Sequence, residues 1–363
     1  MSFLERTRNW YGRFERPISS ISLISGFVFD AITLKRVDTL WENMWILGHI
    51  IIVGIFIILI HLKDNKKGNE NNPSKAHFWF VNILQFFFGG LLSTFLVFYF
   101  RSTDIWVTWP FLLILAIAFI ANESFKKHYI KLSFQISLFF LSIYSFAIFL
   151  VPVILHKIGK GVFIISGIIS LILILVFIGI LFSLVKDKLK ESKRIIICLI
   201  LGIFGLVNLL YFTNLIPPIP LSLKEAGVYH SIERNGEGNY NITRENSDWK
   251  DYFKLYPTFN KVKGSPVYVY SAVFSPANLN INIVHEWQYY DPLNKKWKTD
   301  MEINLGVIGG RDGGFRTYSV RSNISYGKWR VNIKTEQGQT IGRIRFILSS
   351  VNTEPILIND IKE

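Results

Sequence analysis

The sequence predicts a membrane bundle of α-helices followed by an all-β domain. Half of the 363 residues are hydrophobic, and the apolar residues gather in long runs before residue 216. Beyond Pro266 the chain carries short β-branched and aromatic segments separated by turn residues. An apolar run of about 20 residues is long enough to cross a bilayer as a helix. Short strands at regular spacing indicate an antiparallel sandwich, which we expect to be immunoglobulin-like.

Seven apolar runs are candidate transmembrane spans. Six qualify by length: 44–62, 78–100, 105–121, 132–155, 161–185 and 195–215. The run 18–34 is marginal, because four serines and Asp30 interrupt it. If this run crosses, the loops on the two sides carry 16 and 5 Lys and Arg residues, and if it does not, they carry 9 and 12. Because Lys and Arg concentrate in cytoplasmic loops, we expect seven crossings, a cytoplasmic N-terminus and an extracytoplasmic C-terminal half.

The domain boundaries follow from these patterns. We expect a transmembrane helical domain at 1–216, a linker that begins the extracytoplasmic part at 217–265, and the β-sandwich at 266–363. The expected strands are 267–274, 281–290, 301–308, 315–321, 328–335 and 340–348, with weaker patterns at 227–233 and 239–244.

Composition and motifs exclude several classes of function. The net charge is +14, but in the first 215 residues the basic residues lie mostly in short loops, so the charge indicates membrane topology rather than nucleic-acid binding. The single cysteine, Cys198, rules out an internal disulfide. The N-terminus shows no pattern of a cleavable signal peptide. The glycine-rich segment 309–314 lies between strands and lacks the context of a phosphate loop. We expect no metal and no cofactor, and whether the protein is an enzyme stays open.

Polar residues near the ends of the first spans form one group of candidates. Asp30, Thr33, Arg36 and Asp38 lie in "GFVFDAITLKRVD", and Arg101 lies in "YFRSTDIW". One interpretation is that Asp30 reaches water at the helix end and pairs locally. The other is an outward-facing polar site, because ionisable groups inside a membrane are costly and usually functional.

A second group of candidates lies in the β-domain. In the strand "VHEWQY", His285 and Trp287 point to the same face, because strand side chains alternate. One interpretation is a buried aromatic core in which His285 bonds a backbone carbonyl. The other is an aromatic patch that stacks on a sugar or a lipid headgroup.

Three segments resemble a known family. "HEW" (285–287), "FRTYS" (315–319) and "GKWRV" (327–331) resemble the C-terminal module of the bacterial family of unknown function DUF2914. The stretches at 26–38, 85–102 and 216–223 are similar to its multispan members. The resemblance implies a bacterial inner-membrane protein with a small β-module, and it brings no established activity or catalytic residue.

We expect a non-catalytic protein whose module binds an envelope component. Its expected partners are membrane lipids and an envelope glycan, a lipid-linked sugar or a protein. The expected binding residues are His285, Trp287, Arg316, Tyr318 and Trp329, with Arg36 and Arg101 beneath them. The alternative is a membrane-embedded enzyme or carrier for a lipid-linked or phosphorylated substrate. It would use Asp30 or Asp38 as a base or metal ligand, and Arg36 or Arg101 to hold phosphate.

Overall fold

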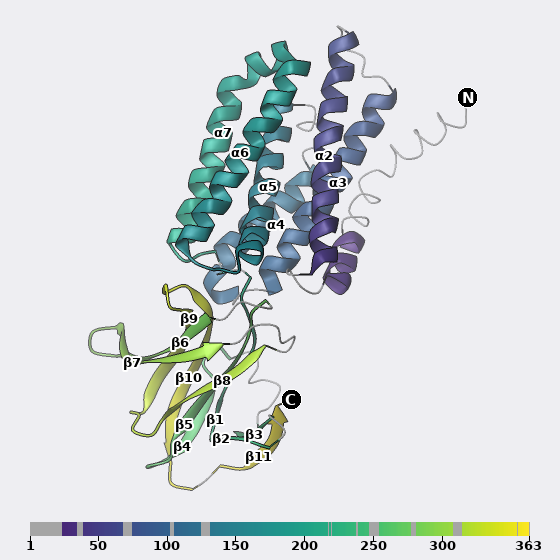
Figure 1. Cartoon of the computed structure of the whole chain (residues 1–363). Coiled ribbons are helices and arrows are strands. Elements are labelled where there is room, and N and C mark those ends of the chain that lie inside the picture. Colours follow the sequence, from purple (N-terminus) through teal and green to yellow (C-terminus); the bar gives the residue numbers. More distant parts are fainter. Residues whose placement is uncertain are drawn as a thin grey trace. The chain divides into compact units, whose positions relative to one another are not determined.

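The chain divides into a helical unit that ends at Ile216 and a β-unit that begins at Pro217, shown in a computed structural model in Figure 1. The structure describes residues 24–34, 39–67, 75–101, 105–124, 131–216, 218, 220–236, 239–246, 254–276, 281–307, 314–353 and 355–362.

The helical unit follows the predicted apolar runs. Its helices are α2 (Leu40–Lys67), α3 (Lys75–Arg101), α4 (Ile105–Ser124), α5 (Leu132–Leu155), α6 (Lys160–Leu184) and α7 (Lys186–Phe212). In the described part of the chain, five of them are long and apolar enough to cross a membrane: α2, α3, α5, α6 and α7. The apolar helices Ile24–Thr33 and Thr108–Ile120 are shorter. The chain is therefore built as a membrane protein.

One boundary in the helical unit differs from the prediction. Residues 186–194, expected as a loop, form the first turns of α7. The physical reason is that Lys, Leu and Glu favour helix even where the segment is too charged to lie within a membrane.

Small residues and a few polar contacts hold the helices together. Cβ atoms added to Gly90 and Gly54 would lie 3.3 Å from His49 and from Phe139, so these glycines let large side chains approach. His61 of α2 hydrogen-bonds the Gln135 side chain of α5 at 3.0 Å. Close approach at glycines and hydrogen bonds between polar side chains are typical of helix packing in membranes.

The β-unit contains three sheets, whose strand orders are β1-β5-β8, β4-β10-β9-β6-β7 and β11-β3-β2. The strands are β1 (Ser222–Tyr229), β2 (Ser231–Arg234), β3 (Tyr240–Glu245), β4 (Thr258–Val262), β5 (Val267–Phe274), β6 (Ile281–Asp291), β7 (Lys296–Val307), β8 (Phe315–Arg321), β9 (Gly327–Thr335), β10 (Thr340–Val351) and β11 (Leu357–Lys362). The region 217–265, expected as a linker, contributes four of them. β1 pairs with β5, and β4 runs parallel to β10. Within this region the sequence indicates only the weak strand patterns at 227–233 and 239–244, and it indicates none over β4, whose place depends on its pairing with β10.

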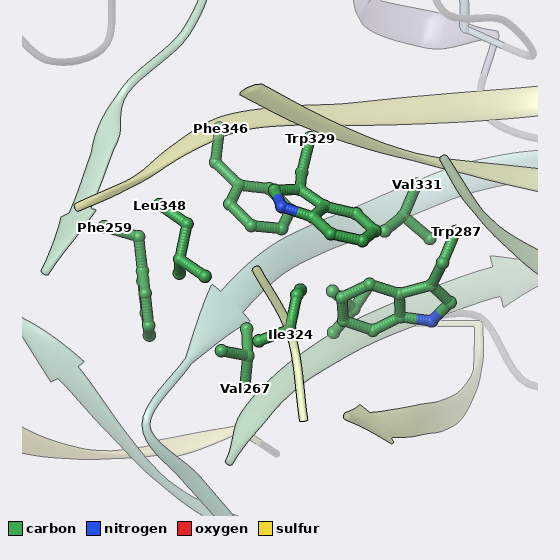
Figure 2. Close-up of a cluster of buried hydrophobic side chains, with 9 residues drawn as sticks. Phe259, Val267, Trp287, Ile324, Trp329, Val331, Phe346 and Leu348 are labelled. Carbon is green, nitrogen blue, oxygen red and sulfur yellow. The ribbon is translucent and has the colours of Figure 1, made fainter. Parts of the chain in front are cut away.

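Two cores separate the sheets. Val267 and Val269 of β5 belong to one buried cluster with Trp287, Trp329 and their neighbours on the five-stranded sheet. Figure 2 shows Val267 beside Trp287 and Trp329. The main core consists of Phe259, Val267, Val269, Trp287, Ile324, Trp329, Val331, Phe346 and Leu348. The other face of β5 presents Tyr270 and Ala272 to a second core with Ile232 and Ile242 of the small sheet. β5 is thus buried on both faces, with alternate residues in the two cores.

Candidate functional site

His285 and Trp287 lie inside the main core and point to the same face, as predicted. Both side chains are fully buried. His285 Nδ1 contacts Ser319 Oγ at 2.8 Å, and its Nε2 contacts Ser271 Oγ at 2.8 Å. Trp287 Nε1 donates to the same Ser319 oxygen at 3.0 Å. The bond to a backbone carbonyl expected for His285 is replaced by bonds to hydroxyl groups, which β5 and β8 present toward the ring.

This network leaves His285 uncharged. Burial lowers the pKa of His285 to about 4, because a protonated ring would have to lose its hydration without a carboxylate to pair with. The network therefore organises the core and offers no open surface to a ligand.

The other predicted module residues are divided between the two cores. Trp329 is buried in the main core and donates its Nε1 proton to Ser325 O at 2.8 Å. Tyr318 packs against the second core. Buried Arg316 donates to Lys362 O at 2.6 Å, which ties the last strand to β8. These five residues do not converge on a common surface.

The predicted membrane residues are only partly described. Asp30 is half-buried in the helix Ile24–Thr33. Thr33 Oγ1 donates to Phe29 O at 2.8 Å. Arg36 and Asp38 lie outside the described residues, as does the side chain of Arg101.

A different surface of the β-unit gathers charge. Lys328 and Arg330 of β9 alternate with the core residues Trp329 and Val331, so they lie on the opposite face of the five-stranded sheet. Arg343 and Arg345 of β10 lie on that same face. We call Lys328, Arg330, Arg343 and Arg345 the basic face. Lys328 is exposed and the three arginines are half-buried.

Strand register sets the basic face in rows that run across the sheet. In one row Arg345 of β10 lies directly opposite Arg330 of β9, which lies opposite Gln288 of β6. In the next row Arg343, Asn332 and Glu286 lie opposite one another. In the third row Trp297 of β7 pairs with Tyr290 of β6, next to Lys328. Like charges in directly opposed cross-strand positions destabilise a sheet, so the Arg330–Arg345 pair is a costly arrangement.

Amide side chains fix the arginines in place. Arg330 Nε donates to Gln288 Oε1 at 2.6 Å, and Arg343 Nε donates to Asn332 Oδ1. The Asn332 amide donates in turn to Glu286 Oε2 at 2.6 Å. In the part of the chain that the structure describes, the two Nη groups of Arg330 have no hydrogen-bond partner. These Nη groups are the donors with which a guanidinium binds a carboxylate or phosphate.

Two carboxylates share this face and partly offset its charge: Glu286 is paired with Lys334 and also acts on Arg330, and Glu302 of β7 lies opposite Glu286. Burial by itself would raise the pKa of Glu286, but hydrogen bonds from Lys334 and Asn332 hold that pKa below its ordinary value. Burial, together with the charges of Arg343 and Arg345, lowers the pKa of Arg330 to about 10. Arg330 is therefore still a cation at neutral pH, in a place where other cations repel it.

Aromatic rings surround one end of the basic face. The Arg330 guanidinium lies 4.4 Å from the centre of the Trp297 ring. Lys328 Nζ lies 5.6 Å from the Tyr256 ring and 6.0 Å from the Tyr290 ring. All three rings are partly exposed. They restrain the cations by cation–π contacts and also offer apolar surface.

The basic face was not predicted from the sequence, although the alternation along β9 indicates that Lys328 and Arg330 share an exposed face. The strand "KWRVNIK" alternates polar and apolar residues, which predicts one buried face and one exposed face. The sequence pattern led to Trp329 as the predicted binding residue of this strand, but Trp329 lies on the buried face. That Arg345 faces Arg330 depends on the register between β9 and β10, which one sequence does not reveal.

The comparison with protein families identifies the region that carries this face. Residues 280–347 match the family described as a protein of unknown function, DUF2914. The C-terminal part of the chain contains a DUF2914 module. The match runs from β6 into β10 and includes all four cations of the basic face. It confirms the resemblance drawn from the "HEW", "FRTYS" and "GKWRV" segments.

Other comparisons add little to this assignment. None of the curated proteins matches the chain. A β-glucosidase from Listeria innocua in complex with glucose is similar at 7% identity with a TM-score of 0.20, over 36% of this chain and 16% of that chain. The alkylpurine DNA glycosylase AlkC of Pseudomonas fluorescens, bound to DNA containing an abasic site analogue, has 9% identity and a TM-score of 0.22, over 75% of this chain and 72% of that chain. Neither similarity supports an argument about the DUF2914 module.

Proposed function

We propose that this protein is a non-catalytic binding protein of the bacterial inner membrane, whose β-unit binds an anionic envelope component through the basic face. One observation carries the proposal: Arg330 and Arg345 occupy directly opposed positions on neighbouring strands. A bound oxyanion between them would turn their repulsion into attraction, and charge-assisted bonds to guanidinium groups are strong and geometrically specific.

The proposal includes a topology. The helical unit crosses the membrane seven times with its N-terminus in the cytoplasm, and the β-unit is an immunoglobulin-like sandwich outside it. The loop charges support this arrangement. The test is cysteine labelling of intact cells with an impermeant maleimide, after Cys198→Ala. Leu293→Cys lies in the turn between β6 and β7, where Leu293 is 93% exposed, and should be labelled. Lys193→Cys in α7 should react only after lysis. The reverse pattern would contradict the topology.

The binding proposal is tested on the full-length protein in nanodiscs of neutral lipid, with fluorescent short-chain polyphosphate as the probe. The variant Arg330→Gln/Arg345→Gln should bind the probe about 10- to 100-fold more weakly, since hydrogen bonds to charged groups contribute about 1.5–3 kcal/mol. Arg234→Gln makes the same change of side chain at an exposed position on the small sheet and should bind like the original protein. Equal affinities of the double variant and this control would remove the basic face as the binding site.

A second function is favoured by one observation in the helical unit. The Asp30 carboxylate is half-buried in the apolar helix Ile24–Thr33, and ionisable groups inside a membrane are functional candidates. A membrane-embedded enzyme or carrier acting on a lipid-linked or phosphorylated substrate would depend on this carboxylate. Under this alternative, Asp30→Asn should abolish the cellular function while the protein is still produced at normal levels. Retained function would eliminate the alternative.

A further inference from the structure

The basic face is longer than any single acid group. Lys328 lies four residues from Asn332, which faces Arg343, and a strand rises about 3.3 Å per residue. The cations therefore extend over roughly 13 Å along the strand, in three successive rows. One carboxylate or phosphate reaches only part of that length, so the face suits a chain that carries repeated acid groups.

The cations are arranged for directed hydrogen bonds and not only for general attraction. Gln288 and Asn332 occupy the Nε donors of Arg330 and Arg343, and this fixes the plane of each guanidinium. Planar, fixed donors favour bidentate contact with a carboxylate or phosphate. An anionic membrane surface needs no such orientation, because flexible lysines attract lipid headgroups equally well.

The aromatic end of the face adds a second kind of contact. Trp297, Tyr290 and Tyr256 surround the row that contains Lys328, and each ring is partly exposed. A sugar ring has an apolar C–H face that packs on such side chains, whereas an inorganic polyanion has none. Acid groups would meet the arginines while a neighbouring sugar ring packs at the aromatic end.

We infer that the ligand of the basic face is an acidic glycan, a sugar chain with carboxylate or phosphate groups at repeated positions, lying along β9. This inference rests on the proposed function, in which the face binds an anion. It names the class of that anion and assigns Trp297 and Tyr290 to the sugar ring.

The test compares four probes on the full-length protein in nanodiscs of neutral lipid. They are oligomers of a hexuronic acid with two to six sugars, a polyphosphate of equal charge, a neutral hexose oligomer of equal length, and vesicles containing phosphatidylglycerol. The hexuronate should bind at least tenfold more tightly than the polyphosphate, and its affinity should rise with length until the oligomer covers the face. Trp297→Ala should weaken hexuronate binding severalfold more than polyphosphate binding, because both probes lose the restraint of Arg330 but only the hexuronate loses the apolar face of the ring. Trp297→Phe, which keeps an aromatic face, should restore most of the loss.

The outcomes separate the two claims. Equal binding of hexuronate and polyphosphate, with no effect of Trp297→Ala, would overturn the glycan assignment and leave anion binding intact. A preference for the lipid vesicles over every soluble probe would also overturn it. If no anion binds, or if Arg330→Gln/Arg345→Gln binds each anion as well as Arg234→Gln does, the proposed function itself fails.

Discussion

The buried histidine of the β-unit makes its stability depend on pH. His285 is fully buried between the hydroxyl groups of Ser271 and Ser319, and burial lowers its pKa to about 4 from an ordinary value of 6.5. Between these two values the unfolded chain binds a proton that the folded chain does not bind, so stability falls as the pH falls. Above about pH 6.5 the buried histidine costs the folded state nothing in this way. Below it the loss of unfolding free energy grows with each unit of pH, until it is complete near pH 4.

The size of the effect follows from the shift. Well inside the window each pH unit is worth about 1.4 kcal/mol, and at pH 6.5 the slope is half as large, so lowering the pH from 6.5 to 5 should cost about 1.6 kcal/mol of unfolding free energy. This interval avoids most of the titration of Asp and Glu residues. The assay is hydrogen–deuterium exchange of β5, β6 and β9 in the full-length protein, which reports the opening of the β-unit alone.

The matched variant is His285→Gln, whose amide can hydrogen-bond hydroxyl groups without titrating. It should be less stable at pH 7 but should lose most of the slope between pH 6.5 and 5. If the slope is the same in both proteins, His285 is not the source of the pH dependence and the argument from burial is refuted.

Two further predictions concern strain in the β-unit. Arg345→Gln removes one member of the opposed arginine pair and should raise the stability of the ligand-free protein by about 0.2–1 kcal/mol at low salt. Urea unfolding should show that this gain shrinks at high salt, and a loss of stability at low salt would show that the pair is not repulsive. Gly314 has φ of +84°, and an added Cβ would lie 3.0 Å from the backbone of Ala272 and Val273. Gly314→Ala should therefore cost at least about 1–2 kcal/mol, whereas exposed Gly236→Ala, with no atom within 4 Å of the added Cβ, should be far milder.

Most helices and strands were predictable from the sequence where their apolar residues recur at regular spacing. The segments 267–274 and 315–321 were predicted with the bounds that β5 and β8 have in the structure. In β5, core residues alternate along the chain, and β8 pairs with β5 over its whole length. β4 and β11 were not predicted, because five or six residues with few apolar positions give too weak a pattern. Their place is decided by pairing with β10 and β3.

The candidate site was harder to predict than the fold. His285, Trp287 and Trp329 stand out in the sequence because such residues often form sites, but here they fill a core. Arg330 and Arg345 look like ordinary exposed strand residues when each strand is considered alone. Whether they form a binding site depends on the strand register, which places Arg330 and Arg345 opposite each other. Local patterns reveal which residues alternate, and tertiary pairing decides which charges meet.

The claim that the basic face binds an acidic glycan is tested most directly by measuring how much the ligand stabilises the β-unit. A ligand that binds only the folded state at 100 times its dissociation constant adds about 2.7 kcal/mol to the unfolding free energy. Hydrogen exchange of β9 and β10 in the full-length protein would be measured with and without the hexuronate oligomer. We predict this gain for the original protein and for Arg234→Gln, and only about 0.4–1.4 kcal/mol for Arg330→Gln/Arg345→Gln at the same ligand concentration, as its 10- to 100-fold weaker binding requires. An equal gain in all three proteins would place the binding site elsewhere and contradict the account.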